Sequence, residues 1–350
     1  MKLSWLLSSY FIVLIMIFCF SCKPSKQSRK TIVKEEKNTA QTSKIHGVNF
    51  VSTNNSVTPE NFKSLEKINA NWVAIIPFSY MKDNDATVYF NSSWQWFGET
   101  PEGTVNYIQS AKANKLKTLI KPHIWPANGW IGELDFKTDQ EWGKFEETYQ
   151  TYILTFAKIA QEQQAEMFCI GVELKKIVRK RPQYFIKLIK EVKKVYKGQI
   201  TYAANWDNYQ NITFWNDLDH IGIDGYFPIS IDKTPSVEKA IEKWSSINTE
   251  LEEFSKKLKK PILFTEYGYR NIDYAGKQPW IDDQQPSLNN EAQSNLYSAF
   301  YESIWKKKWF TGGFLWKWYP NHSTSGGKNN NRFTPQNKPV EEIIKKKALM

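Results

Sequence analysis

From Ile45 onward, short apolar runs alternate with longer segments in which apolar residues recur at the spacing of an amphipathic helix. Runs of this length, bounded by polar residues and rich in Val, Ile and Phe, predict buried strands. The expected strands cover 45–51, 72–78, 116–121, 167–173, 200–205, 218–225, 261–267 and 312–318. Strands that alternate with helices in this number predict an α/β fold of the (β/α)8 TIM-barrel type. The alternative is an open doubly wound sheet, but its glycine-rich first turn is missing here.

Two of the apolar runs end on a glutamate. In EMFCIGVELKK, residues 166–176, the run ends at Glu173, and in KKPILFTEYGYR, residues 259–270, it ends at Glu266. A charged group at the tip of a buried strand is costly unless it is paired or used. Because barrel active sites lie at the carboxyl ends of the strands, we expect both carboxylates in the same mouth.

Two carboxylates across a pocket are the groups that cleavage of a glycosidic bond requires. One must be protonated to donate to the leaving oxygen, and the other must be ionised to attack the sugar. Mutual repulsion and desolvation separate the two pKa values and so assign these roles. The competing interpretation is that each glutamate is only the structural partner of a nearby Lys or Arg.

Polar and aromatic residues occupy the other predicted strand ends. The candidates for substrate binding are His123, Trp125, Asn205, Trp206, Asp224, Tyr226, Trp316 and Trp318. Trp rings can pack on the apolar faces of sugars, whereas Asn, His and Tyr can hydrogen-bond hydroxyl groups. Taken singly, each has a structural explanation, such as core packing for a Trp or a strand-end cap for Asp224. Their convergence on one mouth favours a sugar-binding site.

The composition leaves a second class of function open. Of 350 residues, 15 are Trp and 17 are Tyr, and the formal net charge is +11. Aromatic rings with a basic surface can also bind nucleic acid. The lysines, however, are spread along helix faces, which is typical of solvated surface, and no zinc-ligand spacing or phosphate loop accompanies them. Nucleic-acid binding is therefore the weaker hypothesis, and no nucleic-acid partner is expected.

The N-terminal segment predicts export. Residues 1–21 have Lys2, an apolar stretch and Ser21 before Cys22, the pattern of a bacterial lipoprotein signal peptide. Cys22 would carry the lipid, residues 22–44 would form a flexible tether, and residues 45–350 would form the catalytic domain. This predicts anchoring to the cell envelope, with the outer membrane favoured; the alternative is an uncleaved transmembrane anchor. Of the three cysteines, Cys169 remains and is expected to be a small buried residue.

Several motifs together resemble glycoside hydrolase family 113. They are GVEL, ITYAANW, FWNDLDHIGIDGYFP, PILFTEYGYR and GGFLWKWYP, and the resemblance covers most of residues 45–320. It implies a (β/α)8 barrel with retaining chemistry, endo-β-1,4-mannanase activity and no metal or organic cofactor. It further implies Glu173 as acid/base and Glu266 as nucleophile, with Tyr226 near the nucleophile and Trp316 beneath the sugar. His123, Asn205 and Trp206 would line the sugar sites.

One position departs from the pattern of the wider clan. An asparagine that contacts the sugar 2-hydroxyl usually precedes the acid/base glutamate, and here the residue is Val172. We expect Asn205 to take over this contact.

The retaining mechanism predicts carboxyl groups about 5–5.5 Å apart. Segments 79–102 and 271–288 are candidate walls of the cleft. The alternatives are a non-catalytic glycan-binding lipoprotein and a retaining glycosidase for another β-linked glycan.

Overall fold

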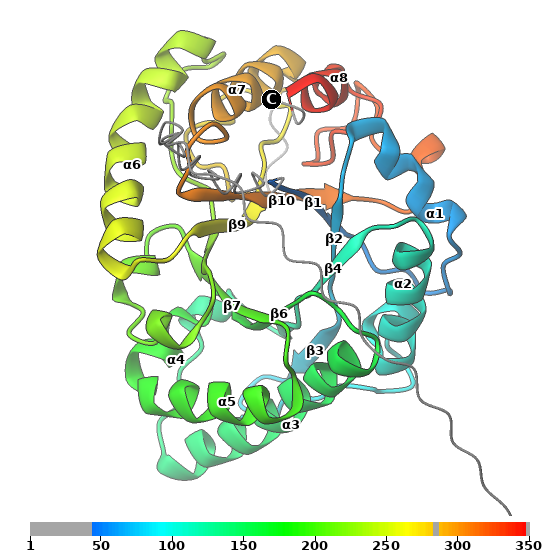
Figure 1. The fold of residues 1–350 in the computed structure, drawn as a ribbon, viewed down its shortest axis with the longest axis vertical. Coiled ribbons are helices and arrows are strands. Elements are labelled where there is room, and N and C mark those ends of the chain that lie inside the picture. The colour runs from blue at the N-terminus through cyan, green and yellow to red at the C-terminus, as the bar shows by residue number, and fades with distance from the viewer. Residues whose placement is uncertain (1–43, 283–286, 348–350) are drawn as a thin grey trace, which may run out of the picture. The chain divides into compact units, whose positions relative to one another are not determined.

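The computed structural model describes residues 44–282 and 287–347 and shows a closed barrel of parallel strands. The order around the barrel is β1-β10-β9-β8-β7-β6-β4-β2. These strands are β1 Ile45–Phe50, β2 Trp72–Ile75, β4 Lys117–Ile120, β6 Met167–Val172, β7 Gln199–Asn205, β8 Ile221–Asp224, β9 Ile262–Tyr267 and β10 Phe310–Trp318. Figure 1 shows these strands in the middle of the molecule with helices around them. The predicted (β/α)8 barrel is confirmed.

Each predicted strand is present, but the second, third and sixth are shorter than expected; the sixth, β8, covers only Ile221–Asp224 of the predicted 218–225. β2 ends at Ile75 and β4 at Ile120, and each is followed by a short outer strand, β3 Phe78–Met81 or β5 His123–Pro126. Pro77 and Pro122 stand at the two interruptions. Proline has no N–H to donate to the ladder, so the barrel pairing stops there. β3 and β5 then pair with each other as a separate parallel ribbon beyond the barrel.

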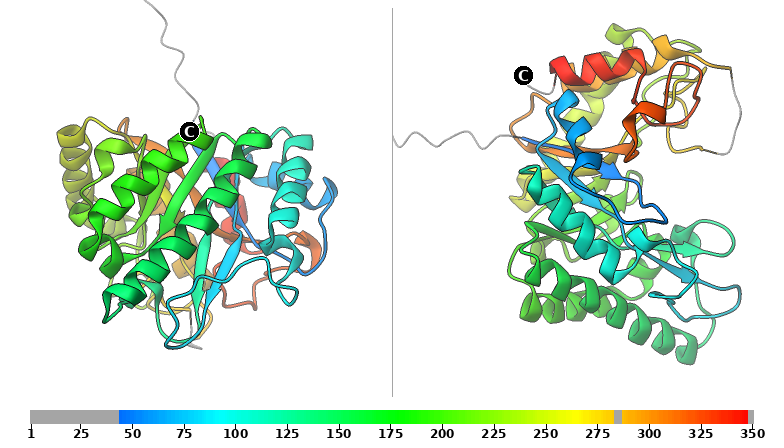
Figure 2. Two further views of the ribbon diagram at one scale, coloured as in Figure 1. Left: turned by 90° about the horizontal axis from the view of Figure 1, so that it is seen from below. Right: turned by 90° about the vertical axis from the view of Figure 1, so that its right-hand side faces the viewer.

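The helices lie outside the strands (Figure 2). They are α1 Glu60–Lys63, α2 Pro101–Ala113, α3 Asp139–Glu162, α4 Lys175–Lys180, α5 Pro182–Val195, α6 Val237–Leu258, α7 Asn290–Ser303 and α8 Pro339–Lys347. Short 3-10 turns cover Ser64–Ile68, Phe97–Glu99, Ile131–Glu133, Tyr209–Asn211, Trp215–Asp217 and His322–Thr324. α3 begins with a capping box, in which Thr138 and Glu141 satisfy each other's backbone N–H groups. No helix among the described residues is both long and apolar enough to cross a membrane.

Two layers of apolar side chains hold the barrel together. The larger layer packs between the strands and the helices, and a smaller one fills the interior of the barrel. The interior layer consists of Ile45, Trp72, Ala74, Leu119, Met167, Cys169, Val172, Ala203, Leu263 and Phe314. Cys169 is fully buried in it, as its position in an apolar strand predicted. This filled interior forms the floor beneath the mouth at the carboxyl ends of the strands.

The barrel closes where β1 meets β10, and this contact depends on a glycine. Gly312 has a φ of 129°, and a Cβ added there would lie 2.1 Å from the carbonyl oxygen of Ile45. A side chain at this position would therefore be strained and would also collide with the neighbouring strand.

Candidate active site

The two strand-end glutamates lie on one cavity at the carboxyl-terminal mouth of the barrel. Glu173 directly follows β6 in the left-handed region with φ 52°, and Glu266 lies near the end of β9. Both line a cavity of about 410 Å³. The other residues that line it are Phe78, His123, Ile124, Trp125, Pro126, Ala127, Gly129, Trp130, Ile131, Val172 and Trp316. The expectation that both glutamates share one mouth is thus confirmed.

Glu266 is buried and each of its carboxylate oxygens has a partner. The ammonium nitrogen of Lys121 lies 2.5 Å from Oε1, and the hydroxyl of Tyr226 donates a 2.8 Å hydrogen bond to Oε2. Nε2 of His123 lies 3.9 Å from Oε1. A cation and a donated hydrogen bond both stabilise the ionised carboxylate, which is the form that a nucleophile requires.

Lys121 is fully buried between two carboxyl groups. Its ammonium lies 3.5 Å from Oδ1 of Asp224 as well as 2.5 Å from Glu266. Burial opposes the charge, but the two carboxylates outweigh burial and raise the pKa of Lys121. Burial and the neighbouring Glu266 carboxylate raise the pKa of Asp224 well above its usual range. Lys121 therefore stays charged and faces both carboxyl groups from below the cavity.

Glu173 has a different environment. Burial first, and then the negative charge of Glu266, raise its pKa to about 7, although a hydrogen bond from Trp130 opposes the rise. That bond runs from the indole Nε1 to Oε2 over 2.9 Å. A carboxyl group with this pKa is protonated over the mildly acidic range and can donate a proton. The site thus holds one carboxyl group suited to donate and one suited to attack.

Aromatic rings form the walls around the two carboxyl groups. Trp316 lines the cavity and stacks on His123, with ring centroids 6.2 Å apart and planes inclined by 11°. Trp125, in β5, also lines the cavity and is 61% exposed. Burial and the charge of Lys121 lower the pKa of His123 well below its usual value, so its ring is neutral. The Nε2 atom of His123 has no hydrogen-bond partner among the described residues.

Two of the predicted substrate-binding residues are in the wrong place for that role. Asp224 is fully buried, accepts a hydrogen bond from Thr265 and lies next to Lys121. It therefore packs beneath the cavity and does not contact a sugar. Trp318 is also fully buried, and its indole donates to the hydroxyl of Ser64. The pairing register of β10 with β1 shifts between Leu315 and Trp318. Such an irregularity reverses the alternation of side chains, so Trp318 does not share the face of Trp316.

Asn205 and Trp206 lie at the end of β7, outside the lining of the glutamate cavity. Asn205 is in register with Asp224, and its Oδ1 is buried without a hydrogen-bond partner among the described residues. Trp206 stacks on Trp280 at 5.3 Å and lines a separate hollow of about 530 Å³. Trp280 belongs to segment 271–288 but lies outside the lining of the glutamate cavity, so the role of this segment as a wall of the cleft stays a prediction. The contact of Asn205 with a sugar 2-hydroxyl stays a prediction.

The sequence argument missed two residues that shape the site, Lys121 and Trp130. A signal for Lys121 was present, because it is a charge at the end of an apolar run, as are Glu173 and Glu266. Trp130 lies in the loop after β5, and a loop aromatic carries no such signal. Among the described parts of the chain, no group of three or more His, Cys, Asp or Glu could hold a metal ion.

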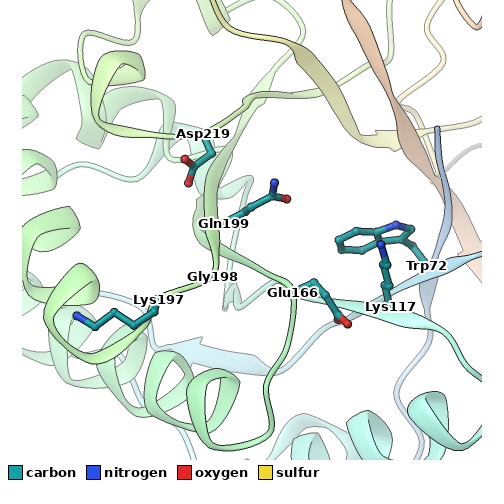
Figure 3. Close-up of a pocket in the computed structure, with 7 residues that line it drawn as sticks. All are labelled: Trp72, Lys117, Glu166, Lys197, Gly198, Gln199 and Asp219. Atoms are coloured by element: carbon teal, nitrogen blue, oxygen red, sulfur yellow. The ribbon is translucent and has the colours of Figure 1, made fainter. Parts of the chain in front are cut away.

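Another hollow of about 420 Å³ lies at the opposite end of the barrel, where the strands begin (Figure 3). Its residues are Trp72, Lys117, Glu166, Lys197, Gly198, Gln199 and Asp219. The carboxylates there are already engaged: Glu166 accepts from the backbone N–H of Thr118, and Asp219 accepts from that of Ile200. These bonds tie strand ends together, which is the structural role expected at this face of a barrel.

An eight-stranded barrel with two glutamates on one cavity at its mouth has the architecture of a glycoside hydrolase. Comparison with protein families gives the particular family. The model described as Glycoside Hydrolase Family 113 matches residues 50–338, well over half of the chain. The chain therefore belongs to glycoside hydrolase family 113 and is a glycoside hydrolase. This finding favours the enzyme over the glycan-binding and nucleic-acid-binding alternatives.

Solved structures show the same fold. A family 113 β-1,4-mannanase in a complex has a TM-score of 0.75 and 24% identity, covering 88% of this chain and 99% of that one. The β-mannanase of Alicyclobacillus acidocaldarius in complex with ManMIm has a TM-score of 0.77 and 21% identity, covering 88% and 97%. A β-glucuronidase from Ruminococcus gnavus has a TM-score of 0.57 and 14% identity, covering 87% and 49%. A comparison with curated proteins found no match.

Proposed function

We propose that this glycoside hydrolase cleaves β-1,4-mannosidic bonds in mannan or manno-oligosaccharides by double displacement. The observation that carries the mechanism is the unequal environment of the two glutamates on one cavity. Lys121 and Tyr226 stabilise the carboxylate of Glu266. Burial and the charge of Glu266 keep Glu173 protonated up to a pH of about 7. The roles of nucleophile and acid/base follow from this difference.

In the first step, a carboxylate oxygen of Glu266 attacks the anomeric carbon. The bond from that carbon to the glycosidic oxygen breaks, and Glu173 gives its proton to the departing oxygen. In the second step, the ionised Glu173 takes a proton from water, and the water oxygen attacks the same carbon. The bond to Glu266 then breaks, so the sugar leaves with its original anomeric configuration and both glutamates regain their starting state.

Two observations support a mannan-type substrate. The chain belongs to family 113, and the solved structures similar to it include β-mannanases.

Val172 lines the cavity beside Glu173 and offers no hydrogen bond to a sugar hydroxyl. We propose that Asn205, at the end of β7 and without a hydrogen-bond partner for its Oδ1 among the described residues, turns its side chain toward the substrate and contacts the 2-hydroxyl. Mannose and glucose differ at this position, so Asn205 would contribute to the choice of sugar.

The test is a product assay with β-1,4-manno-oligosaccharides and β-1,4-gluco-oligosaccharides side by side, with the anomeric form of the first product followed by proton NMR. We expect cleavage of the manno-series with retention. Glu173→Gln and Glu266→Gln should abolish cleavage but keep sugar binding, whereas Glu147→Gln, an exposed change on α3, should leave the rate unchanged. Inversion of the anomeric centre would contradict the mechanism, and cleavage of the gluco-series alone would contradict the choice of sugar.

We also propose that the protein is exported and anchored by a lipid on Cys22. The support is the sequence pattern alone, since residues 1–43 lie outside the described part of the chain. Expression in a bacterium with labelled palmitate should give a labelled, membrane-associated protein. Cys22→Ala should remove both the label and the membrane association, and a labelled Cys22→Ala variant would refute the assignment.

A further inference from the structure

A second hollow adjoins the cavity that contains the glutamates. It has a volume of about 640 Å³ and is lined by Tyr80, Met81, Lys82, Asp83, Tyr89, Ser92, Trp94, Trp125 and Ala127. We propose that this hollow binds further sugar units of the β-linked glycan chain whose scissile bond lies between Glu173 and Glu266. The inference rests on the proposed function and extends it, because sugar units bound in this hollow make kcat/KM depend on the length of the glycan chain.

The two cavities adjoin each other. Trp125 and Ala127, at the end of β5 and directly after it, line both of them. Trp125 is 61% exposed, so its ring is available at the junction. A glycan that leaves the glutamate cavity over Trp125 would therefore reach the second hollow. This adjacency favours a saccharide as the occupant, because under the proposed function the first cavity binds the sugar units on either side of the cleaved bond.

The second hollow combines an apolar surface with hydrogen-bonding groups. Trp94 is 61% exposed and meets Tyr80 edge to face, with centroids 4.6 Å apart. Large exposed rings next to an active site mark a binding surface, and a flat ring suits the C–H face of a sugar. Lys82, Asp83 and Ser92 in the same lining can exchange hydrogen bonds with sugar hydroxyls. A pyranose offers both kinds of surface.

The segment that carries Trp94 is held in place before any ligand binds. Tyr80 and Tyr89 exchange two backbone hydrogen bonds of 2.7 and 2.8 Å. The side chain of Gln95 accepts from the backbone N–H of Ser92 and donates to the carbonyl of Phe78. Because these bonds fix both sides of Trp94, little conformational entropy is lost when a sugar packs on it. The predicted wall 79–102 thus supplies a preformed surface.

The chain offers a matched control for a test of this hollow. Trp96 lies in the same segment and is 51% exposed, but it does not belong to the lining. We would compare kcat/KM for mannobiose to mannohexaose in the parent, Trp94→Ala and Trp96→Ala proteins. In Trp94→Ala, the ratio of kcat/KM for mannohexaose to that for the shortest cleaved substrate should fall about 5–10-fold. In Trp96→Ala this ratio should stay at the parent value.

Equal ratios in the two variants would overturn the proposal. If the parent protein cleaves no manno-oligosaccharide, the proposed sugar specificity fails, and the hollow is judged separately by affinity electrophoresis. Gels that contain soluble β-mannan, glucomannan or β-glucan should then retard the Trp96→Ala protein more than the Trp94→Ala protein in at least one case. Equal migration of the two variants in all three gels would refute a glycan-binding hollow whatever the catalysed reaction.

Discussion

The hydrogen bond from Trp130 to Glu173 makes a specific prediction about the pH dependence of catalysis. The indole N–H donates to Oε2 over 2.9 Å and favours the ionised form of Glu173, whose pKa is nonetheless raised to about 7 by burial and by Glu266. Trp130→Phe keeps an aromatic ring in the wall but removes the donor. The ionised form then loses stabilisation, so the pKa of Glu173 rises further.

The size of the rise follows from the strength and exposure of the bond. A hydrogen bond to a charged group contributes about 1.5–3 kcal/mol, which equals about one to two pKa units at roughly 1.36 kcal/mol per unit. Trp130 is 36% exposed, so water can replace part of the lost interaction. We therefore expect a rise of about half to one unit.

The measurement is the pH profile of kcat/KM, which reports ionisation in the free enzyme. A general acid must be protonated, so activity falls as the pH rises through the pKa of Glu173. The basic limb should lie near pH 7 in the parent protein and move upward in Trp130→Phe. Trp125→Phe is the control, because it changes the same cavity and no hydrogen bond of the described residues joins Trp125 to Glu173. A limb that stays in place or moves downward in Trp130→Phe would refute the reasoning.

Three further predictions concern the floor and the closure of the barrel. Lys121→Met leaves the buried carboxyl groups of Asp224 and Glu266 without their cation, so the free energy of unfolding in urea should fall by about 3–5 kcal/mol. An unchanged free energy of unfolding would contradict the charge argument. Tyr226→Phe removes the hydrogen-bond donor to Glu266 and should lower kcat/KM about 10–100-fold without a comparable loss of unfolding free energy. An unchanged kcat/KM would show that this hydrogen bond is dispensable. Gly312→Ala should lower the free energy of unfolding by about 1–3 kcal/mol in the same urea assay, because Gly312 has a φ of 129° and an added side chain would collide with β1. Parental stability would mean that β1 and β10 can separate at low cost.

The sequence alone was sufficient for the architecture and for the location of the glutamates. Apolar runs separated by amphipathic segments are a local signal, and each predicted strand is present in the barrel. Where β2 and β4 end early, Pro77 and Pro122 explain the interruption, and both could have been used in advance. Glu173 and Glu266 were recognisable because a charge at the end of a buried run needs a function or a partner.

Only the tertiary structure decided which side chains meet in the site and which support it from below. Lys121 directly follows β4, whereas Asp224 and Glu266 lie in β8 and β9, and their contact depends on closure of the barrel. Trp316 faces the cavity whereas Trp318 is buried, because a shift in strand register reverses the alternation of side chains. The alternation of side chains along a strand is a property of a short stretch of chain. The side of the barrel wall on which a side chain lies, the strand register and the charge pairing depend on neighbouring strands. The sequence of a strand therefore indicates that the strand is buried, whereas the packing of the barrel determines which of its side chains meet in the site.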